Sequence, residues 1–132
     1  MNPVETVGDF LDRINRHDVG RLAELMTEDH TFIDSLGHAV SGREEMRAAW
    51  SAYFDFCPDY SVAAERILAD GNVVAAFGSA GGTIAAGGKL APENRWRIPA
   101  AWLAIVKDGR VREWRVYCEN KPVYEIVNRL PA

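Results

Sequence analysis

Hydrophobic residues recur with a helical period over the first part of the chain. Four of them follow the i, i+3, i+4, i+7 spacing that gives a helix one buried stripe: Val7, Phe10, Leu11 and Ile14. Asp18 then stands where it can cap a second, shorter helix, which the polar residues 27–29 end. We therefore expect one helix that runs through about residue 16 and another that starts after Asp18.

A third helix carries the sharpest local signal in the chain. Ser41 and Glu44 have the spacing of a capping box, in which the hydroxyl and the carboxylate accept hydrogen bonds from each other's backbone amides. The apolar stripe behind this start is bulky and aromatic, and Pro58 ends it: Met46, Trp50, Tyr53, Phe54 and Cys57. We expect this helix to cover the core.

The alternation typical of strands replaces the helical period in the second half of the chain. It predicts two hairpins: residues 60–68 with 73–83, and residues 97–106 with 111–119. Residues 30–35 are rich in β-forming side chains and predict a further strand, which ends in a turn at Leu36 and Gly37. We expect a strand end and a loop over residues 81–88, and a short helical turn or an edge segment over residues 121–132.

The pairing of the last hairpin stays open in the sequence. A two-residue turn of type I′ at Asp108 and Gly109 pairs Leu103 with Trp114. A three-residue turn with a glycine bulge pairs Trp102 with Trp114 instead. Because side chains alternate between the two faces of a strand, the choice decides which tryptophan faces the core.

Helices that precede antiparallel hairpins predict an α+β domain. The apolar stripes of the three N-terminal helices can be buried only against the concave face of a curved antiparallel sheet. With 132 residues, the chain fits one domain over residues 1–132. We expect a cone-shaped barrel with a pocket for an apolar small molecule.

Charge and composition limit the classes of molecule that the protein can bind. The chain is 48% hydrophobic and 26% charged with a net charge of −4, which argues against binding to nucleic acid or to anionic membranes. The N-terminus lacks the pattern of a signal peptide and no apolar run is long enough to span a bilayer, so we expect a cytoplasmic protein. The two cysteines and three histidines lack the spacing of a metal site, and we predict neither a metal nor a cofactor.

Several strings resemble the nuclear transport factor 2-like superfamily, which has a cystatin-like fold and includes SnoaL-type polyketide cyclases, ketosteroid isomerases and limonene epoxide hydrolases. The likeness covers nearly the whole chain. It is carried by residues 32–37, by Ser41 to Met46, and by the hairpin over residues 107–117. The resemblance implies the fold, but it does not fix the function, because this fold hosts enzymes, binding proteins and transport factors.

The resemblance implies roles for a few positions. Asp34 falls where ketosteroid isomerases carry the aspartate that moves a proton at a carbon beside a carbonyl. Their oxyanion-hole tyrosine is replaced by Phe10, and their neutral aspartate by Ala101 or Trp102, which argues against steroid isomerisation. The inward aspartate of the epoxide hydrolases is replaced by Val116. Asp34 is therefore the first candidate for an acid/base, and Glu119 is the second.

Two interpretations of Asp34 stay open. If it faces an apolar cavity it is a candidate general base, whereas the other possibility is that it accepts hydrogen bonds in the turn that follows it. The expected walls of the pocket are mostly aromatic, and each member could equally be plain core: Phe10, Trp50, Tyr53, Phe54, Trp102, Trp114, Val116 and Cys118.

Five arginines around the last strands could bind an anionic group, but alternation along an exposed strand explains them as well: Arg95, Arg97, Arg110, Arg112 and Arg115.

The sequence therefore favours a SnoaL-like enzyme that transfers a proton on a hydrophobic carbonyl or polyketide-like compound, in a cyclisation, isomerisation or hydration. The alternative is a non-catalytic protein that binds a small molecule or assembles as a dimer. Val106, Val111 and Tyr117 indicate an apolar outer face of the sheet, so we expect a homodimer through that face.

Overall fold

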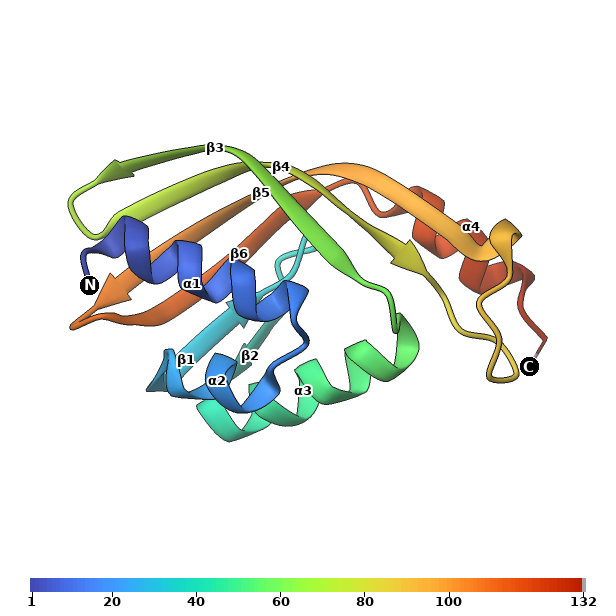
Figure 1. Cartoon of the computed structure of the whole chain (residues 1–132), viewed down its shortest axis with the longest axis horizontal. Helices are drawn as coiled ribbons and strands as arrows, with labels where there is room; N and C mark the ends of the chain where they lie inside the picture. The colour runs from blue at the N-terminus through green and yellow to red at the C-terminus, as the bar shows by residue number, and fades with distance from the viewer. Residues whose placement is uncertain (132) are drawn as a thin grey trace.

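Six strands form one curved sheet in the order β2-β1-β6-β5-β4-β3. The computed structural model describes residues 1–131. The strands are β1 (Met26–Ile33), β2 (Ala39–Ser41), β3 (Ser61–Asp70), β4 (Val73–Thr83), β5 (Arg95–Lys107) and β6 (Arg110–Cys118). The long strands β3 to β6 arch over the helices, as the sequence pattern predicts (Figure 1).

Three helices lie on the concave side of this sheet (Figure 1). They are α1 (Pro3–Asn15), α2 (Val19–Glu24) and α3 (Arg43–Phe56), and β1 and β2 separate the second from the third. The short 3₁₀ helix η1 (Pro92–Asn94) precedes β5, and α4 (Lys121–Arg129) follows β6. This arrangement confirms the predicted α+β fold. Within residues 1–131, no helix is both long and apolar enough to cross a membrane.

The predicted start of one helix is confirmed, whereas the predicted start of another is not. Asp18 caps α2, and its side chain accepts a hydrogen bond from the backbone amide of Arg21 at 3.1 Å. The predicted capping box of α3 is wrong, because the N-cap is Gly42, at a φ of 109°, with no side-chain cap bond. Ser41 instead ends β2 and places its hydroxyl 3.3 Å from that of Thr31. At this turn from β2 into α3 the chain takes a positive φ, which glycine adopts without strain.

The sheet is mixed, which corrects the purely antiparallel prediction. β1 runs parallel to β6, with Phe32 opposite Trp114 and Ile33 opposite Arg115. β2 pairs with the outer side of β1, and its three residues are too few to leave a periodic signal. The parallel pairing arises because β1 and β6 are joined by α3 and the two long hairpins, and not by a tight turn.

The last hairpin follows neither of the two pairings that the sequence left open. Asp108 and Gly109 form a two-residue turn, both with positive φ, as type I′ requires. A register shift between Ile105 and Val106 then inserts one extra residue in β6, so that Trp114 pairs with Ala104 and Trp102 pairs with Val116. Both tryptophans therefore face the core, with ring centroids 6.4 Å apart.

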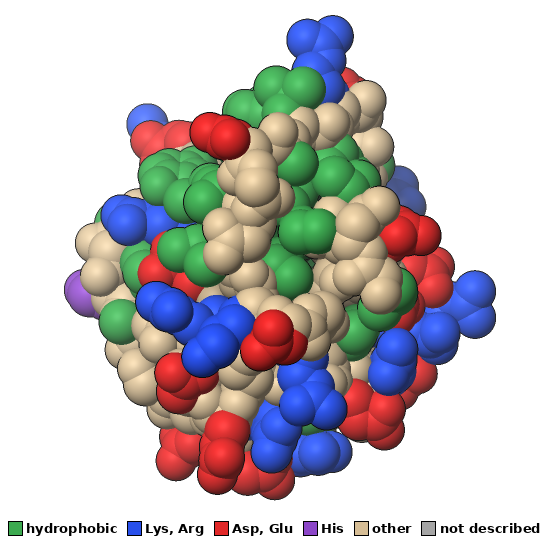
Figure 2. All heavy atoms as spheres, turned by 90° about the vertical axis from the view of Figure 1, so that its left-hand side faces the viewer, with side chains coloured by type: hydrophobic (Ala, Val, Ile, Leu, Met, Phe, Trp, Pro, Cys, Tyr) green, Lys and Arg blue, Asp and Glu red, His purple; other side chains and the backbone are tan. Residues whose placement is uncertain are grey.

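The outer face of the sheet has a different composition from the one expected. Val106 and Val111 are buried on the inner face, which corrects their assignment to the outer one, whereas Tyr117 is exposed on the outer face. The other large exposed apolar side chains on β3 and β4 are Leu68, Val73 and Phe77. Figure 2 shows hydrophobic side chains gathered in the upper part of this end of the molecule, over the sheet, and charged ones below, over the helices.

One glycine permits the bend of the sheet. β3 shifts register between Ala64 and Arg66, where it lies against Gly78 of β4. A Cβ built on Gly78 would overlap the backbone carbonyl of Ala63, so no other residue fits without moving β3. This close approach helps the long strands to curve around the helices.

We predict opposite effects for two glycine-to-alanine substitutions. Gly78→Ala forces a backbone to move and should lower the free energy of unfolding by about 1–3 kcal/mol. Gly8 lies in α1, and a Cβ added there would have nothing within 4 Å. Because alanine has a higher helix propensity than glycine, Gly8→Ala should raise the free energy of unfolding by up to about 1 kcal/mol. Urea unfolding of both variants tests this, and an unchanged midpoint for Gly78→Ala would contradict the role given to this glycine.

A neutral histidine lies at the base of the core. His30 of β1 is fully buried, and its Nδ1 lies 2.7 Å from the carbonyl oxygen of Val111. Since that oxygen only accepts, Nδ1 carries the proton and Nε2 carries the lone pair. Burial lowers the pKa of His30 below its ordinary 6.5, although the Val111 carbonyl and the charge of Asp29 oppose this shift.

This lowered pKa predicts a loss of stability in acid. As the pH falls, His30 takes up a proton more readily in the unfolded chain than in the folded one, so the free energy of unfolding decreases below about pH 6.5. Asparagine can still donate to the Val111 carbonyl but cannot titrate. Urea unfolding at pH 7.5 and 5.5 measures how much the free energy of unfolding changes between these two pH values. This change should be smaller for His30→Asn than for the wild type, and an equal change in both would contradict the prediction.

Candidate functional site

A cavity of about 320 Å³ lies between α3 and the concave face of the sheet. Its walls are mainly apolar and aromatic: Phe32, Trp50, Tyr53, Tyr60, Trp96, Trp102 and Trp114. Trp50 and Tyr53 come from α3, and Trp102 and Trp114 come from neighbouring strands of the sheet. Asp34 is the one charged residue among the described residues that line this cavity.

Most residues predicted for the site from the sequence lie on this wall: Asp34, Trp50, Tyr53, Trp102, Trp114, Val116 and Cys118. Phe10 and Phe54 do not line the cavity. Phe10 of α1 lies behind the wall, with its ring centroid 4.6 Å from that of Trp114. Phe54 of α3 stacks on His17, which lies between α1 and α2, with ring centroids 4.1 Å apart. Both are core residues that support the cavity from outside.

Three aromatic lining residues were missed by the sequence reasoning. Tyr60 lies just after the end of α3, Trp96 is the second residue of β5, and Phe32 lies on β1 opposite Trp114. Strict alternation along β5 could have found Trp96, because it shares a face with Ile98, Ala100 and Trp102. Tyr60 begins the predicted strand over residues 60–68, and its alternation with Val62 could have placed it on the buried face.

Asp34 stands at the end of β1, at the edge of the cavity. Its Oδ1 accepts hydrogen bonds from the backbone amides of Leu36 and His38, both at 2.9 Å. Its Oδ2 lies 3.4 Å from Nδ1 of His38, and the side chain is 40% exposed. One oxygen is thus fixed by the turn, as the second interpretation of Asp34 expects, while the residue also belongs to the cavity wall.

Polar side chains at this edge of the cavity bond to one another. The Cys118 thiol lies 3.5 Å from Oδ1 of Asn120, and Asn120 donates through Nδ2 to the Ser35 hydroxyl at 2.9 Å. Burial raises the pKa of the Cys118 thiol, and the nearby charges of Glu119 and Asp34 raise it further. The thiol is therefore protonated at neutral pH and is a poor nucleophile.

Deeper in the cavity, the two tyrosines are neutral. Their rings meet edge to face with centroids 4.9 Å apart. Burial raises the pKa of both Tyr53 and Tyr60 far above the ordinary value, because a phenolate would lose its hydration there. Each hydroxyl therefore keeps its proton and can donate a hydrogen bond to a bound molecule.

Other residues singled out in the sequence lie elsewhere. Glu119 is exposed and does not line the cavity, which leaves Asp34 as the carboxylate there. Within residues 1–131, no three side chains of His, Cys, Asp or Glu are close enough to hold a metal ion.

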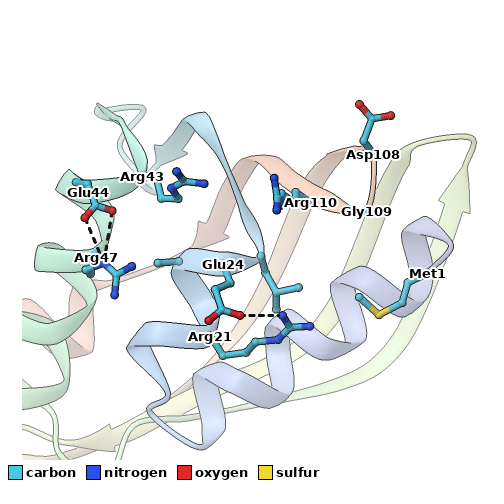
Figure 3. A pocket seen from close by; sticks show the side chains of 11 residues that line it. Met1, Arg21, Glu24, Arg43, Glu44, Arg47, Asp108, Gly109 and Arg110 are labelled. Atoms are coloured by element: carbon cyan, nitrogen blue, oxygen red, sulfur yellow. Dashed lines mark hydrogen bonds and ion pairs between the residues drawn. The ribbon is translucent and has the colours of Figure 1, made fainter.

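The five arginines do not form one cluster. Arg110 borders an open polar hollow near the β5–β6 turn (Figure 3), Arg95 and Arg97 border a groove beside α4, and Arg115 lies over the ring of Tyr117 at 5.2 Å. In the hollow of Figure 3, ion pairs join Arg21 to Glu24 and Arg47 to Glu44. The apolar cavity is therefore the candidate site.

The comparison with solved structures supports the fold. The chain is similar to a protein with a ketosteroid isomerase-like fold from Catenulispora acidiphila in complex with trimethylamine, at 21% identity and a TM-score of 0.80, over 96% of this chain and 94% of that chain. It is also similar to a protein from Jannaschia sp. CCS1 assigned as a SnoaL-like polyketide cyclase, at 25% identity and a TM-score of 0.79, over 98% and 93% of the two chains. The chain is similar as well to an LEH-like epoxide hydrolase from M. tuberculosis, at 18% identity and a TM-score of 0.79, over 96% of this chain and 90% of that chain.

The comparison of sequences identifies the family. The search among curated proteins gives no significant match. The family model of the SnoaL-like domain matches residues 7–114, which include most of α1, all of α2 and α3, the cavity wall up to Trp114 and the position of Asp34. This match confirms the resemblance found in the sequence. The chain therefore belongs to the SnoaL-like domain family.

Proposed function

We propose that the protein catalyses proton transfer at the carbon beside a carbonyl group of a small hydrophobic compound, with Asp34 as the base. One observation carries this proposal: a single carboxylate belongs to the wall of a cavity that is otherwise apolar and aromatic. A base beside an apolar chamber can act on a carbon acid that has left water. The likeness to proteins assigned as polyketide cyclases agrees with this class of reaction.

The two oxygens of Asp34 have different surroundings, which suits this role. Oδ1 is held by two backbone amides, so the carboxylate has a fixed orientation. Oδ2 accepts no backbone amide and can take the proton. In the proposed step the C–H proton moves to Oδ2 and the electron pair of that bond moves to the carbonyl oxygen as an enolate. Return of the proton at another carbon gives isomerisation, whereas attack by the enolate carbon gives cyclisation.

The size of the cavity limits the substrate. Its volume of about 320 Å³ lies at the lower end of the range of about 300–1,000 Å³ found for small-molecule sites. The flat walls of Trp102 and Trp114 favour a planar ligand. We infer a compound of one or two rings.

A second candidate function is the binding of such a compound without catalysis. It is favoured by the hydrogen bonds of Asp34, since a carboxylate that accepts two backbone amides is also what a purely structural turn requires. In that case Asp34 shapes the edge of the cavity and no proton is transferred.

Asp34→Asn separates the two functions. The amide oxygen of asparagine can still accept from Leu36 and His38, so the turn is kept while the base is lost. We expect the wild type to accelerate exchange of the α-hydrogens of 1-tetralone in D₂O, measured by NMR, and the variant to be slower by about 10²–10⁴-fold. Ser35→Ala, at the same edge of the cavity, is the matched control and should stay within a few-fold of the wild type.

Binding of 1-tetralone by calorimetry completes this test. If the wild type binds the ketone and does not accelerate exchange, the binding function replaces the catalytic one. Equal exchange rates for the wild type and Asp34→Asn would remove Asp34 from the mechanism.

We further propose that the protein is a homodimer through the outer face of the sheet. A shallow groove there is lined by apolar side chains of four strands, including Leu68, Phe77, Ala101 and Tyr117. Basic and acidic groups, such as Arg66 and Glu65, border the same groove. A two-fold axis can bring Arg66 of one copy near Glu65 of the other and the reverse, which supports self-association.

Phe77→Glu should convert this dimer into a monomer, because it places a charge in the middle of the apolar face. Size-exclusion chromatography with light scattering at micromolar concentration measures the change. Tyr124→Glu, on the exposed side of α4, is the control and should remain dimeric. A wild type that is monomeric under these conditions would contradict the proposed dimer.

A further inference from the structure

A second concave region of the surface lies apart from the cavity. It is an open polar hollow of about 720 Å³, formed where α2, the start of α3 and the β5–β6 turn meet (Figure 3). Within residues 1–131, the hollow and the cavity share no lining residue. Four arginines line the hollow: Arg21, Arg43, Arg47 and Arg110. A site here is therefore separate from Asp34 and from the ligand proposed for the cavity.

Two of these arginines are neutralised by carboxylates and two are not. Arg21 and Arg47 each form an ion pair with a glutamate of the same helix, at 3.1 and 3.4 Å. In the part of the chain that the structure describes, Arg43 and Arg110 form no ion pair. The remaining carboxylate of the hollow, that of Asp108, is directed away from both of them (Figure 3). The hollow therefore contains two positive charges that are not balanced locally.

The backbone brings Arg43 and Arg110 to the same edge of the hollow. Nη1 of Arg43 lies 3.5 Å from the carbonyl oxygen of Met26. The backbone amide of Val111, the residue after Arg110, donates to the carbonyl oxygen of Leu25 at 2.6 Å. The first residue of α3 and the first residue of β6 therefore flank two consecutive residues of the chain. In Figure 3 their guanidinium groups face one another across the opening.

Two cations in this arrangement repel each other unless an anion lies between them. A guanidinium group offers five N–H donors in a planar fork, which matches the oxygens of a phosphate or a carboxylate. Arg43 uses one of its donors, at long distance, on a backbone carbonyl. This contact helps to orient the group and leaves its other donors for a ligand. The pair therefore suits a ligand group with two negative charges and several acceptor oxygens.

We propose that Arg43 and Arg110 bind the phosphate group of a small polar molecule. A phosphate monoester carries a charge of about −1.5 to −2 at pH 7 and three acceptor oxygens, so it matches two arginines better than a carboxylate does. The rest of the hollow is open and lined mainly by charged side chains, which suits a hydrophilic ester and not the hydrophobic compound proposed for the cavity. Arg110 is one of the arginines for which the sequence left anion binding open, and Arg43 is its partner from a distant segment.

The test uses ribose 5-phosphate as the probe, because ribose is its matched control without the phosphate. In nitrogen–proton correlation NMR spectra at low ionic strength, the amide signals of Arg43, Gly109 and Arg110 should shift with ribose 5-phosphate and not with ribose. Arg43→Gln and Arg110→Gln should each weaken binding by about 10-fold, because each loses a hydrogen bond to a charged group. Inorganic phosphate distinguishes the sources of the group: if it binds as tightly as the ester the hollow is a site for the free ion, and if it binds more weakly the ester is the ligand.

Two controls separate this site from a general effect of charge. The double variant Glu44→Gln with Arg47→Gln removes an ion pair of the same hollow without changing the net charge, and it should bind like the wild type. Arg16→Gln removes a positive charge outside the hollow and should stay within about 2-fold of the wild type, because salt screens distant surface charges.

Three results would overturn the inference. They are the absence of shifts with millimolar ribose 5-phosphate, shifts confined to amides outside the hollow, and wild-type affinity in both Arg43→Gln and Arg110→Gln. Asp34→Asn should bind the probe like the wild type, since Asp34 does not line the hollow. This proposal and the one for the cavity therefore fail separately.

Discussion

The extra residue in β6 decides what the last strand presents to the core, and the cavity depends on it. In a strand, a shift of one residue moves every following side chain to the opposite face. With the shift between Ile105 and Val106, the residues that face inward are Trp114, Val116 and Cys118. Without it, Glu113, Arg115 and Tyr117 would face inward, and the hollow would hold charges in place of an aromatic floor.

The elements that the sequence predicts correctly are those whose signal is local. The helical stripe that includes Phe10, the cap at Asp18 and the turn at Asp108 each depend on residues close in sequence, and the structure has them where they are expected. The resemblance to ketosteroid isomerases is what names Asp34 as a candidate acid/base, and the turn that follows it indicates its other possible role. Its two hydrogen bonds to backbone amides depend on the same short segment.

The features that the sequence does not predict are contacts between segments far apart in the chain. The parallel pairing of Phe32 with Trp114 joins residues far apart in the chain, and no short pattern encodes it. The bulge in β6 changes the pairing by one position. Neither turn type considered for this hairpin places an extra residue inside the strand, and its local sign is the pair of adjacent polar residues Arg112 and Glu113. Tyr60 reaches the cavity because the chain turns sharply after α3, so its position depends on the packing of that helix.

The parallel contact between β1 and β6 also has a consequence for how the chain folds. β1 lies near the N-terminus, but its partner is the last strand, so this pairing closes a loop that includes almost the entire sheet. Closing such a loop costs chain entropy before its contacts contribute any stability, which slows folding in proteins rich in distant contacts. On the ribosome, His30 and Phe32 must wait for β6 to be synthesised before they are covered. The growing chain therefore exposes this edge until a late stage, when it is most open to aggregation.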